Sequence, residues 1–348
     1  MKKLFIAALA LASVACTKSE VLETAPQKAI SFGKPFVENS TKAIDPSLTA
    51  TTFKQFYVYG TISNGTATAN IFNGELVSKD IPSNPGVSDN TYGTWGYAAT
   101  ATQYWIPDNA YAFKAVSGVE KAAISADNAT KMPTSISYDA TSQKDLVYAI
   151  NNFGVFGTGE GKNSETCVAF AFNHLLSKAK FSFTTDYPNG YSVKVTSVKI
   201  TNANSNGVYT LNANAEKAPF GTWEPTVPTE LDFGNVVASD ATAAAESIAI
   251  VNTDANTKNS SLYERLMIPA SYEEVRIVYS YEVYYTDGTN TVKVMTVTDK
   301  TASVDKVVLN EGCSYNFTGI IKHNMKAITF TVNKLNGWTP ANPNPTVN

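Results

Sequence analysis

The amino-acid sequence predicts an all-β protein whose strands form two sandwich domains. Residue types that favour strands and turns, namely Tyr, Phe, Thr, Val and Asn, are abundant in the chain. Apolar residues alternate with polar ones over short stretches separated by turn residues, and no helical period persists for three turns. The 348 residues exceed one ordinary domain and are enough for two.

The first predicted strand runs from Ala29 to Val37, and its apolar residues Ile30 and Phe32 alternate with small ones. Pro35 lacks the N–H that a central strand donates, so it confines this strand to a sheet edge or ends it. The further strands predicted in the first half are Phe53 to Gly60, Tyr111 to Val116, Asp145 to Ala149 and Cys167 to Phe172. The last of these is apolar throughout, which indicates burial on both faces.

The clearest local element of the second half is a hairpin that turns at Asp287-Gly288. A two-residue loop of this type favours a type I′ turn. Pairing outward from it places Val283 opposite Val292 and Glu282 opposite Lys293, so one face is apolar and the other carries a charge pair. The other strands expected in this half are Ala179 to Thr184, Tyr191 to Ile200, Val208 to Leu211, Ser314 to Ile321 and Ala327 to Val332.

The N-terminus has the form of a lipoprotein export signal. Lys2 and Lys3 precede an uncharged apolar run, and the small residue Ala15 stands before Cys16. The run is too short to span a bilayer. Cys16 is then the lipidated first residue of the mature chain, and its acyl chains suffice for stable anchoring. Ser13 departs from the usual leucine, and an ordinary cleaved signal with a chance cysteine is the alternative.

We therefore expect four parts along the chain. They are a signal peptide at residues 1–15, a lipidated tether at 16–28, an N-terminal β-sandwich domain at 29–173 and a C-terminal β-sandwich domain at 174–348.

The charge balance does not indicate a nucleic-acid partner. The chain has 27 Lys and Arg against 30 Asp and Glu, a net charge of −3, whereas nucleic-acid binding requires a basic surface. The only arginines are Arg265 and Arg276, so no arginine cluster is available for bidentate binding of phosphates or carboxylates. No group of His, Cys, Asp and Glu has metal-ligand spacing, and the sequence predicts neither a metal nor a cofactor.

No residue pattern indicates an enzyme, since Gly-x-Ser-x-Gly motifs and Gly-rich phosphate loops are absent from the sequence. His174 follows an apolar run, where it is either a general base or, more commonly, a hydrogen-bonded histidine at a strand end. Glu273 and Glu274 are adjacent, so on a strand they point to opposite faces and cannot form a catalytic pair. A glycosidase whose two acids lie far apart in the sequence stays an alternative.

Two cysteines are left for a disulfide if Cys16 is acylated, namely Cys167 and Cys313. They lie in separate parts of the chain, and Cys167 begins an apolar run. Two independent buried thiols are therefore favoured over a disulfide.

Four aromatic residues, Trp95, Tyr97, Tyr104 and Trp105, are concentrated in a short stretch. Sugar-binding modules stack glycans on such side chains, but core packing is the simpler interpretation in a β protein. Exposure of Trp95, Tyr104 and Trp105 on a flat surface would favour glycan binding, and burial would favour a structural role.

These aromatics belong to a longer pattern. It consists of Trp95-Gly96-Tyr97, Tyr104-Trp105-Ile106-Pro107, Tyr111-Ala112-Phe113-Lys114-Ala115, Asp145-Leu146-Val147-Tyr148-Ala149 and the stretch from Val168 to Phe181. In order and spacing the pattern resembles the fimbrillin family of Bacteroidales over essentially the whole chain. The resemblance implies two β-sandwich domains of transthyretin-like topology and the function of a structural fimbrial subunit in cell adhesion.

The resemblance also implies a maturation pathway. Proteins of this family are exported as lipoproteins, a protease removes the N-terminal segment with its first strand, and a strand of another subunit fills the groove. In this chain the replaced strand would carry Ile30 and Phe32, and the cut would fall between Lys42 and Ala43. The family commonly has arginine at this site, so a lysine-specific or trypsin-like protease is implied here.

The implied partners are other fimbrial subunits and, through the lipid on Cys16, the outer membrane. The implied location is the cell surface and the fimbrium, and the receptor is not specified. The segment from Ala327 to Val332, with the tail to Asn348, is a candidate donor strand. The alternative function is that of a monomeric surface lipoprotein that binds glycans through exposed aromatics.

Overall fold

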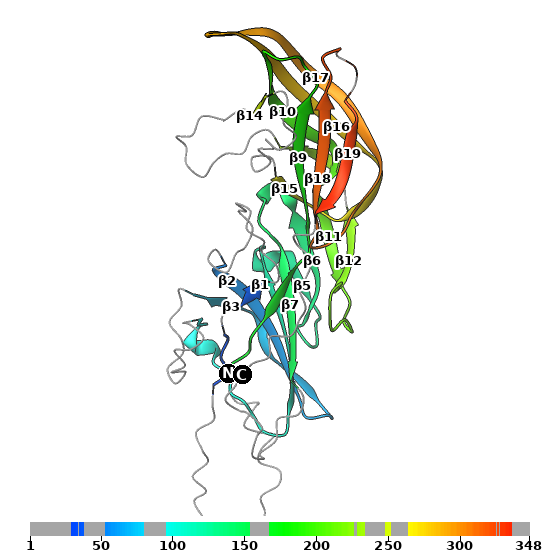
Figure 1. The fold of residues 1–348 in the computed structure, drawn as a ribbon. Coiled ribbons are helices and arrows are strands. Elements are labelled where there is room, and N and C mark those ends of the chain that lie inside the picture. The colour runs from blue at the N-terminus through cyan, green and yellow to red at the C-terminus, as the bar shows by residue number, and fades with distance from the viewer. Residues whose placement is uncertain are drawn as a thin grey trace, which may run out of the picture.

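The computed structural model describes residues 29–33, 35–37, 53–79, 95–153, 167–225, 228–233, 248–251, 264–324, 326 and 328–335. Within these residues the helical elements are three 3-10 turns, η1 (Ala99–Ala101), η2 (Lys121–Ala123) and η3 (Ala140–Ser142), and the other regular elements are β-strands. The strands form four sheets, which pack in pairs into two sandwiches along one long axis (Figure 1). The predicted all-β sandwich fold is confirmed.

The N-terminal sandwich pairs a six-stranded sheet with a four-stranded sheet. The larger sheet has the order β1-β8-β7-β4-β2-β3. Its strands are β1 (Phe36–Val37), β8 (Ala171–His174), β7 (Val147–Phe153), β4 (Ala110–Ser117), β2 (Gln55–Ser63) and β3 (Thr68–Ser78). The smaller sheet consists, in order, of β12 (Gly221–Pro225), β11 (Asn206–Leu211), β6 (Pro133–Asp139) and β5 (Ile124–Ala126).

The C-terminal sandwich pairs a five-stranded sheet with a four-stranded sheet. The former contains, in order, β13 (Pro228–Asp232), β10 (Tyr191–Asn204), β16 (Ala270–Asp287) and β17 (Asn290–Leu309), and β14 (Ile248–Val251) also pairs with β10. The latter contains β15 (Glu264–Met267), β9 (Ser177–Thr185), β18 (Ser314–Ile321) and β19 (Phe330–Leu335). A core of aromatic rings lies between them, in which Phe181 stacks on Phe317 at a centroid distance of 5.2 Å.

The six-stranded sheet is covered on both faces. Since alternate residues of a strand point to opposite sides, its side chains enter two separate cores. Tyr59 of β2 faces the four-stranded sheet, whereas Phe56 of the same strand packs in a second core on the other side. Among the described residues, irregular segments at 29–33 and 95–105 rather than a sheet cover this second core. We refer to the two sides as the sheet-covered face and the segment-covered face.

Pairing in the N-terminal sandwich crosses the predicted domain boundary between residues 173 and 174. β11 lies beyond that boundary in the sequence, yet it pairs with β6 from Asn206↔Asp139 to Thr210↔Ser135. The chain therefore returns to the first sandwich after starting the second, and the division at this point stays a prediction.

The hairpin of β16 and β17 is present, but its register differs from the predicted one. The closing pair is Asp287↔Asn290, so Gly288 and Thr289 form the loop, and Tyr285 rather than Val283 lies opposite Val292. Gly288 has φ 58°, the left-handed conformation that the turn requires and that glycine adopts without strain. The predicted charge pair forms across a diagonal, with Lys293 Nζ 2.9 Å from Glu282 Oε1.

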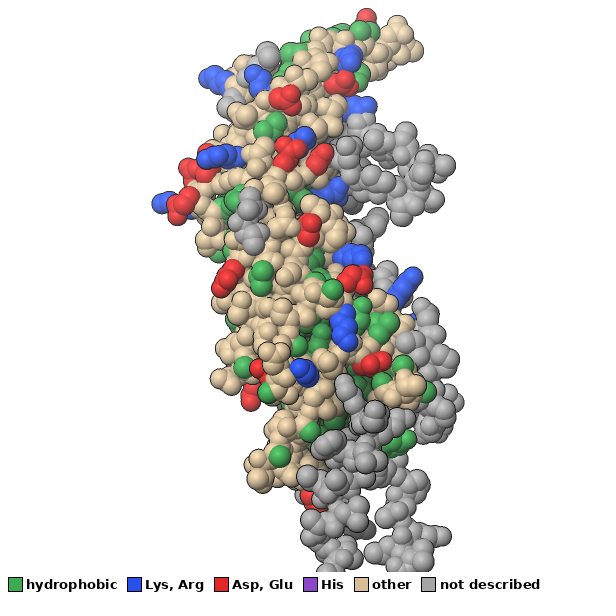
Figure 2. Space-filling model, turned by 180° about the vertical axis from the view of Figure 1, so that it is seen from behind, with side chains coloured by type: hydrophobic (Ala, Val, Ile, Leu, Met, Phe, Trp, Pro, Cys, Tyr) green, Lys and Arg blue, Asp and Glu red, His purple; other side chains and the backbone are tan. Residues whose placement is uncertain are grey.

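Side chains on the surface mix the two signs of charge. On the face drawn in Figure 2, acidic and basic side chains are interspersed over both sandwiches. This distribution agrees with the net charge of −3 and provides no basic stripe on that face. No disulfide joins Cys167 and Cys313, as predicted. Cys313 is buried in the C-terminal sandwich, whereas Cys167 is half-buried and not fully buried as expected.

Candidate functional site

The segment from Ala29 to Val37 lies on the segment-covered face and ends as the edge strand of the six-stranded sheet. Ile30 and Phe32 are 0% and 2% exposed, so the alternation predicted from the sequence buries both side chains. After Pro35 the chain forms β1, which pairs in parallel with β8 through Phe36↔Ala171 and Val37↔Phe172. We call residues 29–37 the N-terminal segment.

Aromatic rings surround Phe32 in the core. Its ring centroid lies 5.5–6.2 Å from five others, of which four are edge-on and one is stacked; they belong to Phe56, Phe72, Tyr97, Phe113 and Phe170. Such pairs contribute roughly 0.5–1.5 kcal/mol each beyond the area that they bury. Phe32 is therefore a central side chain of this core, although it comes from the first described residues of the chain.

Few main-chain hydrogen bonds hold the N-terminal segment. Ile30 N donates to Gln103 O at 2.8 Å, and Gly33 N donates to Val168 O at 2.9 Å. Val168 N donates to Ser31 O at 2.8 Å. In its described residues, 29–33 and 35–37, the segment thus joins two chain stretches through isolated bridges, one antiparallel and one parallel, and the two pairs of β1 are its only ladder.

One side chain adds a further bond to this segment. Tyr97 Oη donates to the Ile30 carbonyl at 2.8 Å while its ring packs edge-on against Phe32 and Phe72. Both atoms are buried, so the bond also satisfies a carbonyl that would otherwise lose its hydration. Sequence reasoning grouped Tyr97 with the aromatic patch and did not identify this role.

The aromatic patch is mainly part of the core. Trp95, Tyr97 and Trp105 are 7%, 3% and 4% exposed, whereas Tyr104 is 46% exposed. Trp105 packs edge-on against Tyr111, with 4.7 Å between the ring centroids. Burial in this core raises the pKa of the Tyr111 hydroxyl. The burial of both tryptophans favours the structural interpretation, because a single exposed tyrosine does not form a stacking platform.

His174 is a buried residue at the end of β8. Its Nδ1 lies 2.6 Å from Oδ2 of Asp145, and both side chains are almost fully buried. Asp145 comes from the stretch before β7, and the pairing Val147↔His174 brings the two together. Because the two residues are 29 positions apart in the sequence, no local pattern predicted that they would pair. Its seclusion from solvent fits a structural role.

The remaining predicted site residues differ in what the structure describes. Cys16, Lys42 and Ala43 lie outside the described residues. Of the candidate donor from Ala327 to Val332, the described part is already in place: Ile328 and Phe330 are buried in the C-terminal core, and β19 pairs with β18. The tail from residue 336 onward lies outside the described residues.

The described part of the chain contains neither a metal-binding cluster nor a membrane-spanning helix. There, no group of three or more His, Cys, Asp and Glu could hold a metal ion. No helix in the same residues has the length and hydropathy of a membrane span.

Comparisons with known proteins extend over most of the chain. The model of a family described as fimbrillin-like matches residues 41–338. Among solved structures, a fimbrial protein from Bacteroides vulgatus superposes with a TM-score of 0.61 and 19% identity, over 90% of this chain and 100% of that one. A protein named for cell adhesion from Parabacteroides distasonis superposes with a TM-score of 0.52 and 11% identity, over 91% and 98%. A comparison with curated proteins found no match.

Proposed function

The chain belongs to the fimbrillin-like family, and on this basis we propose that it is a structural subunit of a surface fimbria that serves cell adhesion. The family is one of structural fimbrial proteins and not of enzymes. We further propose that subunits assemble by strand exchange after the N-terminal segment has been removed.

The observation that carries the assembly proposal is the difference between the two faces of the six-stranded sheet. On the segment-covered face, Ile30 and Phe32 fill the core from a stretch held by isolated bridges. Burial of each such side chain contributes roughly 1.5–3 kcal/mol. Removal of the segment would expose a continuous aromatic surface around the former position of Phe32, and only another apolar strand would cover it.

The edge of the sheet supports the same proposal. In the part of the chain that the structure describes, β1 pairs with two residues of β8, and its loss leaves the main chain of an edge strand open to pairing. An incoming strand can use these groups for affinity and alternate side-chain pockets for register. The donor would be a strand of another fimbrial subunit, of the same or another kind. In this chain Pro340, Pro343 and Pro345 make the tail after β19 a poor ladder strand.

The delivery step follows from the N-terminal sequence. We propose that Cys16 carries lipid, that the precursor reaches the outer membrane on this anchor, and that a cut after Lys42 releases anchor and segment together. A base subunit would escape the cut and keep its tether.

Limited proteolysis tests the assembly proposal. Trypsin treatment of a soluble precursor that begins at residue 17 should remove the chain up to Lys42 and yield polymers visible by electron microscopy. Lys42→Gln is the matched control and should leave the precursor monomeric. An excess of a synthetic peptide of residues 28–38 should refill the groove and block polymerisation. A chain that loses the segment and stays monomeric under all conditions would refute strand exchange.

A further inference from the structure

A pocket of about 640 Å³ lies where the two sandwiches meet. One wall comes from the end of β8 and from the chain that enters β12, and the other from residues 269–271 and from the end of β17 with its following turn. Its volume is in the range of small-molecule sites. We call it the junction pocket, and its principal lining residues are Pro219, Thr222, Trp223, Pro269, Leu309 and Glu311.

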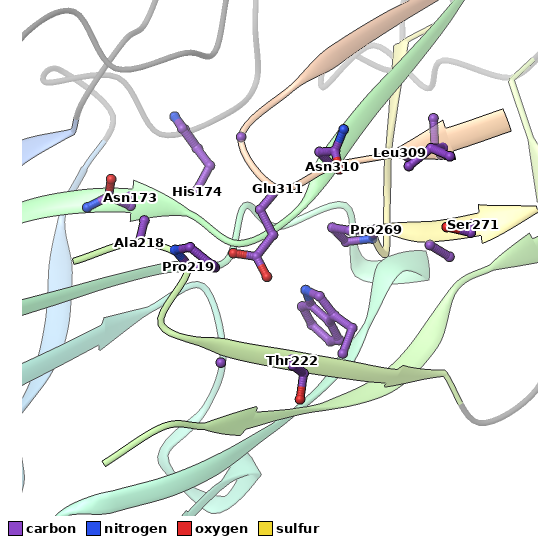
Figure 3. Close-up of a pocket in the computed structure, with 15 residues that line it drawn as sticks. Asn173, His174, Ala218, Pro219, Thr222, Pro269, Ser271, Leu309, Asn310 and Glu311 are labelled. Atoms are coloured by element: carbon purple, nitrogen blue, oxygen red, sulfur yellow. The ribbon is translucent and has the colours of Figure 1, made fainter. Parts of the chain in front are cut away.

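Glu311 is held in the pocket by a tight turn. Gly312 N donates to Leu176 O at 2.9 Å, and Ser177 Oγ donates to Asn310 O at 3.0 Å, which fixes the turn on both sides of the glutamate. Gly312 has φ 63°, a conformation that a residue with a side chain adopts only with strain. In Figure 3 the Glu311 side chain extends into the middle of the pocket, between Pro219 and Pro269.

Within the described part of the chain, the Glu311 carboxylate has one polar partner. Tyr209 Oη donates to Oε2 at 3.2 Å, which leaves Oε1 available. Among the residues that the structure describes, no Lys or Arg lines the pocket, and Glu311 forms no ion pair. Burial raises the pKa of the Glu311 carboxyl to about 7, so it is largely ionised above neutral pH and lacks a countercharge.

The neighbouring groups do not compensate this charge. His174 also lines the pocket, but its Nδ1 pairs with Asp145, and in Figure 3 its ring points away from Glu311. Trp223 Nε1 donates to Leu175 O at 2.8 Å, so the indole is fixed in position. The walls near Glu311 are thus mainly apolar and rigid, with two prolines and one indole.

We propose that the junction pocket binds a primary ammonium group on an alkyl chain, with the ammonium at Glu311 and the chain between the prolines and Trp223. One available carboxylate oxygen suits a compact ammonium, whereas a guanidinium prefers two parallel acceptors. The indole adds a cation–π contact and the prolines accommodate the methylene groups. The source of the group is a lysine side chain of a peptide segment or a free diamine.

Calorimetric titration of the full precursor tests this site. The probes are 1,5-diaminopentane and the pentapeptide Ala-Ala-Lys-Ala-Ala, which distinguish the two sources, and the norleucine analogue of the peptide lacks only the charge. We expect one of the amines to bind at millimolar concentration or below, and the norleucine peptide to bind at least tenfold more weakly. No binding of either amine at 10 mM, or equal binding of the norleucine peptide, would overturn the proposal.

Glu311→Gln is the decisive variant, because glutamine still accepts the hydrogen bond from Tyr209 and loses only the charge. We expect it to lower the affinity for the amine at least tenfold, since a hydrogen bond to a charged group is lost. Glu230→Gln is the matched control, because Glu230 is an exposed acid that pairs with Lys199. Unchanged affinity in the Glu311 variant would exclude the carboxylate as the binding group. The measurement uses the uncleaved monomer, so it is independent of strand exchange.

Discussion

The two faces of the six-stranded sheet are both buried, but they are closed in different ways. On the sheet-covered face, four strands joined by ladders supply side chains such as Ile136 and Tyr209. On the segment-covered face, Ile30 and Phe32 reach a core of buried apolar and aromatic side chains from a stretch with isolated bridges. A ladder fixes a side chain through many neighbours, whereas an isolated segment can leave as one unit.

A side chain can be fully buried without a ladder of main-chain hydrogen bonds to hold it in the core. Phe32 and Tyr209 are 2% and 0% exposed, so their burial alone does not distinguish their roles. The main chain around them does distinguish them, because Tyr209 lies in a ladder whereas the described residues around Phe32 form isolated bridges. Under the proposed strand exchange, the core that Ile30 and Phe32 fill is complete in the precursor and open after cleavage, which is the property that a strand acceptor requires.

The largest effect that tests the comparison is expected for Phe32→Ala. Loss of the ring should destabilise the N-terminal sandwich by roughly 3–5 kcal/mol, because five neighbouring rings lose their common partner. Urea unfolding of the precursor measures this loss. Tyr104→Ala is the control, since Tyr104 is exposed, and its effect should stay below about 1 kcal/mol. A Phe32 variant as stable as that control would mean that the segment is dispensable for the closed fold.

The second prediction concerns the pH dependence of the free energy of unfolding, which should differ between the two faces. Glu311 accepts from Tyr209, a side chain of the sheet-covered core, and burial raises the pKa of its carboxyl from 4.5 to about 7. The folded chain therefore retains a proton between these values that the unfolded chain releases. The stabilisation that this proton provides is fully present below about pH 4.5 and is lost as the pH rises through 7.

The expected size is on the order of 2 kcal/mol, since each pKa unit corresponds to about 1.4 kcal/mol and partial contact with solvent reduces the total. Urea unfolding at pH 5 and pH 8 measures it in the precursor and in Glu311→Gln, which should lack this component. The core of the segment-covered face consists of apolar and aromatic residues, so hydrogen exchange of Ile30 and Val168 amides should report no comparable pH-dependent opening. Equal pH dependence in both variants would assign the effect to other groups.

Sequence reasoning identified most strands and the burial of the N-terminal segment because these depend on local patterns, whereas removal of the segment stays a prediction. The alternation of Ile30 and Phe32 around small residues predicted burial, and Pro35 predicted a position at the sheet edge. The hairpin around Gly288 was also predicted, but its register was shifted by one residue on each strand, because the loop is Gly288-Thr289 instead of Asp287-Gly288. With this loop Lys293 lies opposite Tyr284, which places its ammonium on a diagonal of Glu282 instead of directly opposite it.

The features that the sequence did not reveal depend on contacts between distant residues. Residues 206–225 return to the first sandwich, although the local pattern of β11 is that of any short strand. Asp145 and His174 meet because two strands pair, and Glu311 meets Tyr209 across 102 residues. A single carboxylate in a polar turn has no sequence pattern of its own. The junction pocket could not be predicted, because its walls come from strands of both sandwiches that are distant in the sequence.

The smallest effect concerns the hydrogen bond that ties Tyr97 to the N-terminal segment. Tyr97→Phe keeps the ring against Phe32 and removes the donor to the Ile30 carbonyl, so the expected loss is about 1 kcal/mol. Hydrogen exchange in the precursor should show faster opening of the segment, measured at the Ile30 and Gly33 amides, while amides in the ladder between β4 and β7 keep their protection. Equal acceleration of exchange in β4 and β7 would instead mean that the whole face opens together, and the segment would not be a separate unit.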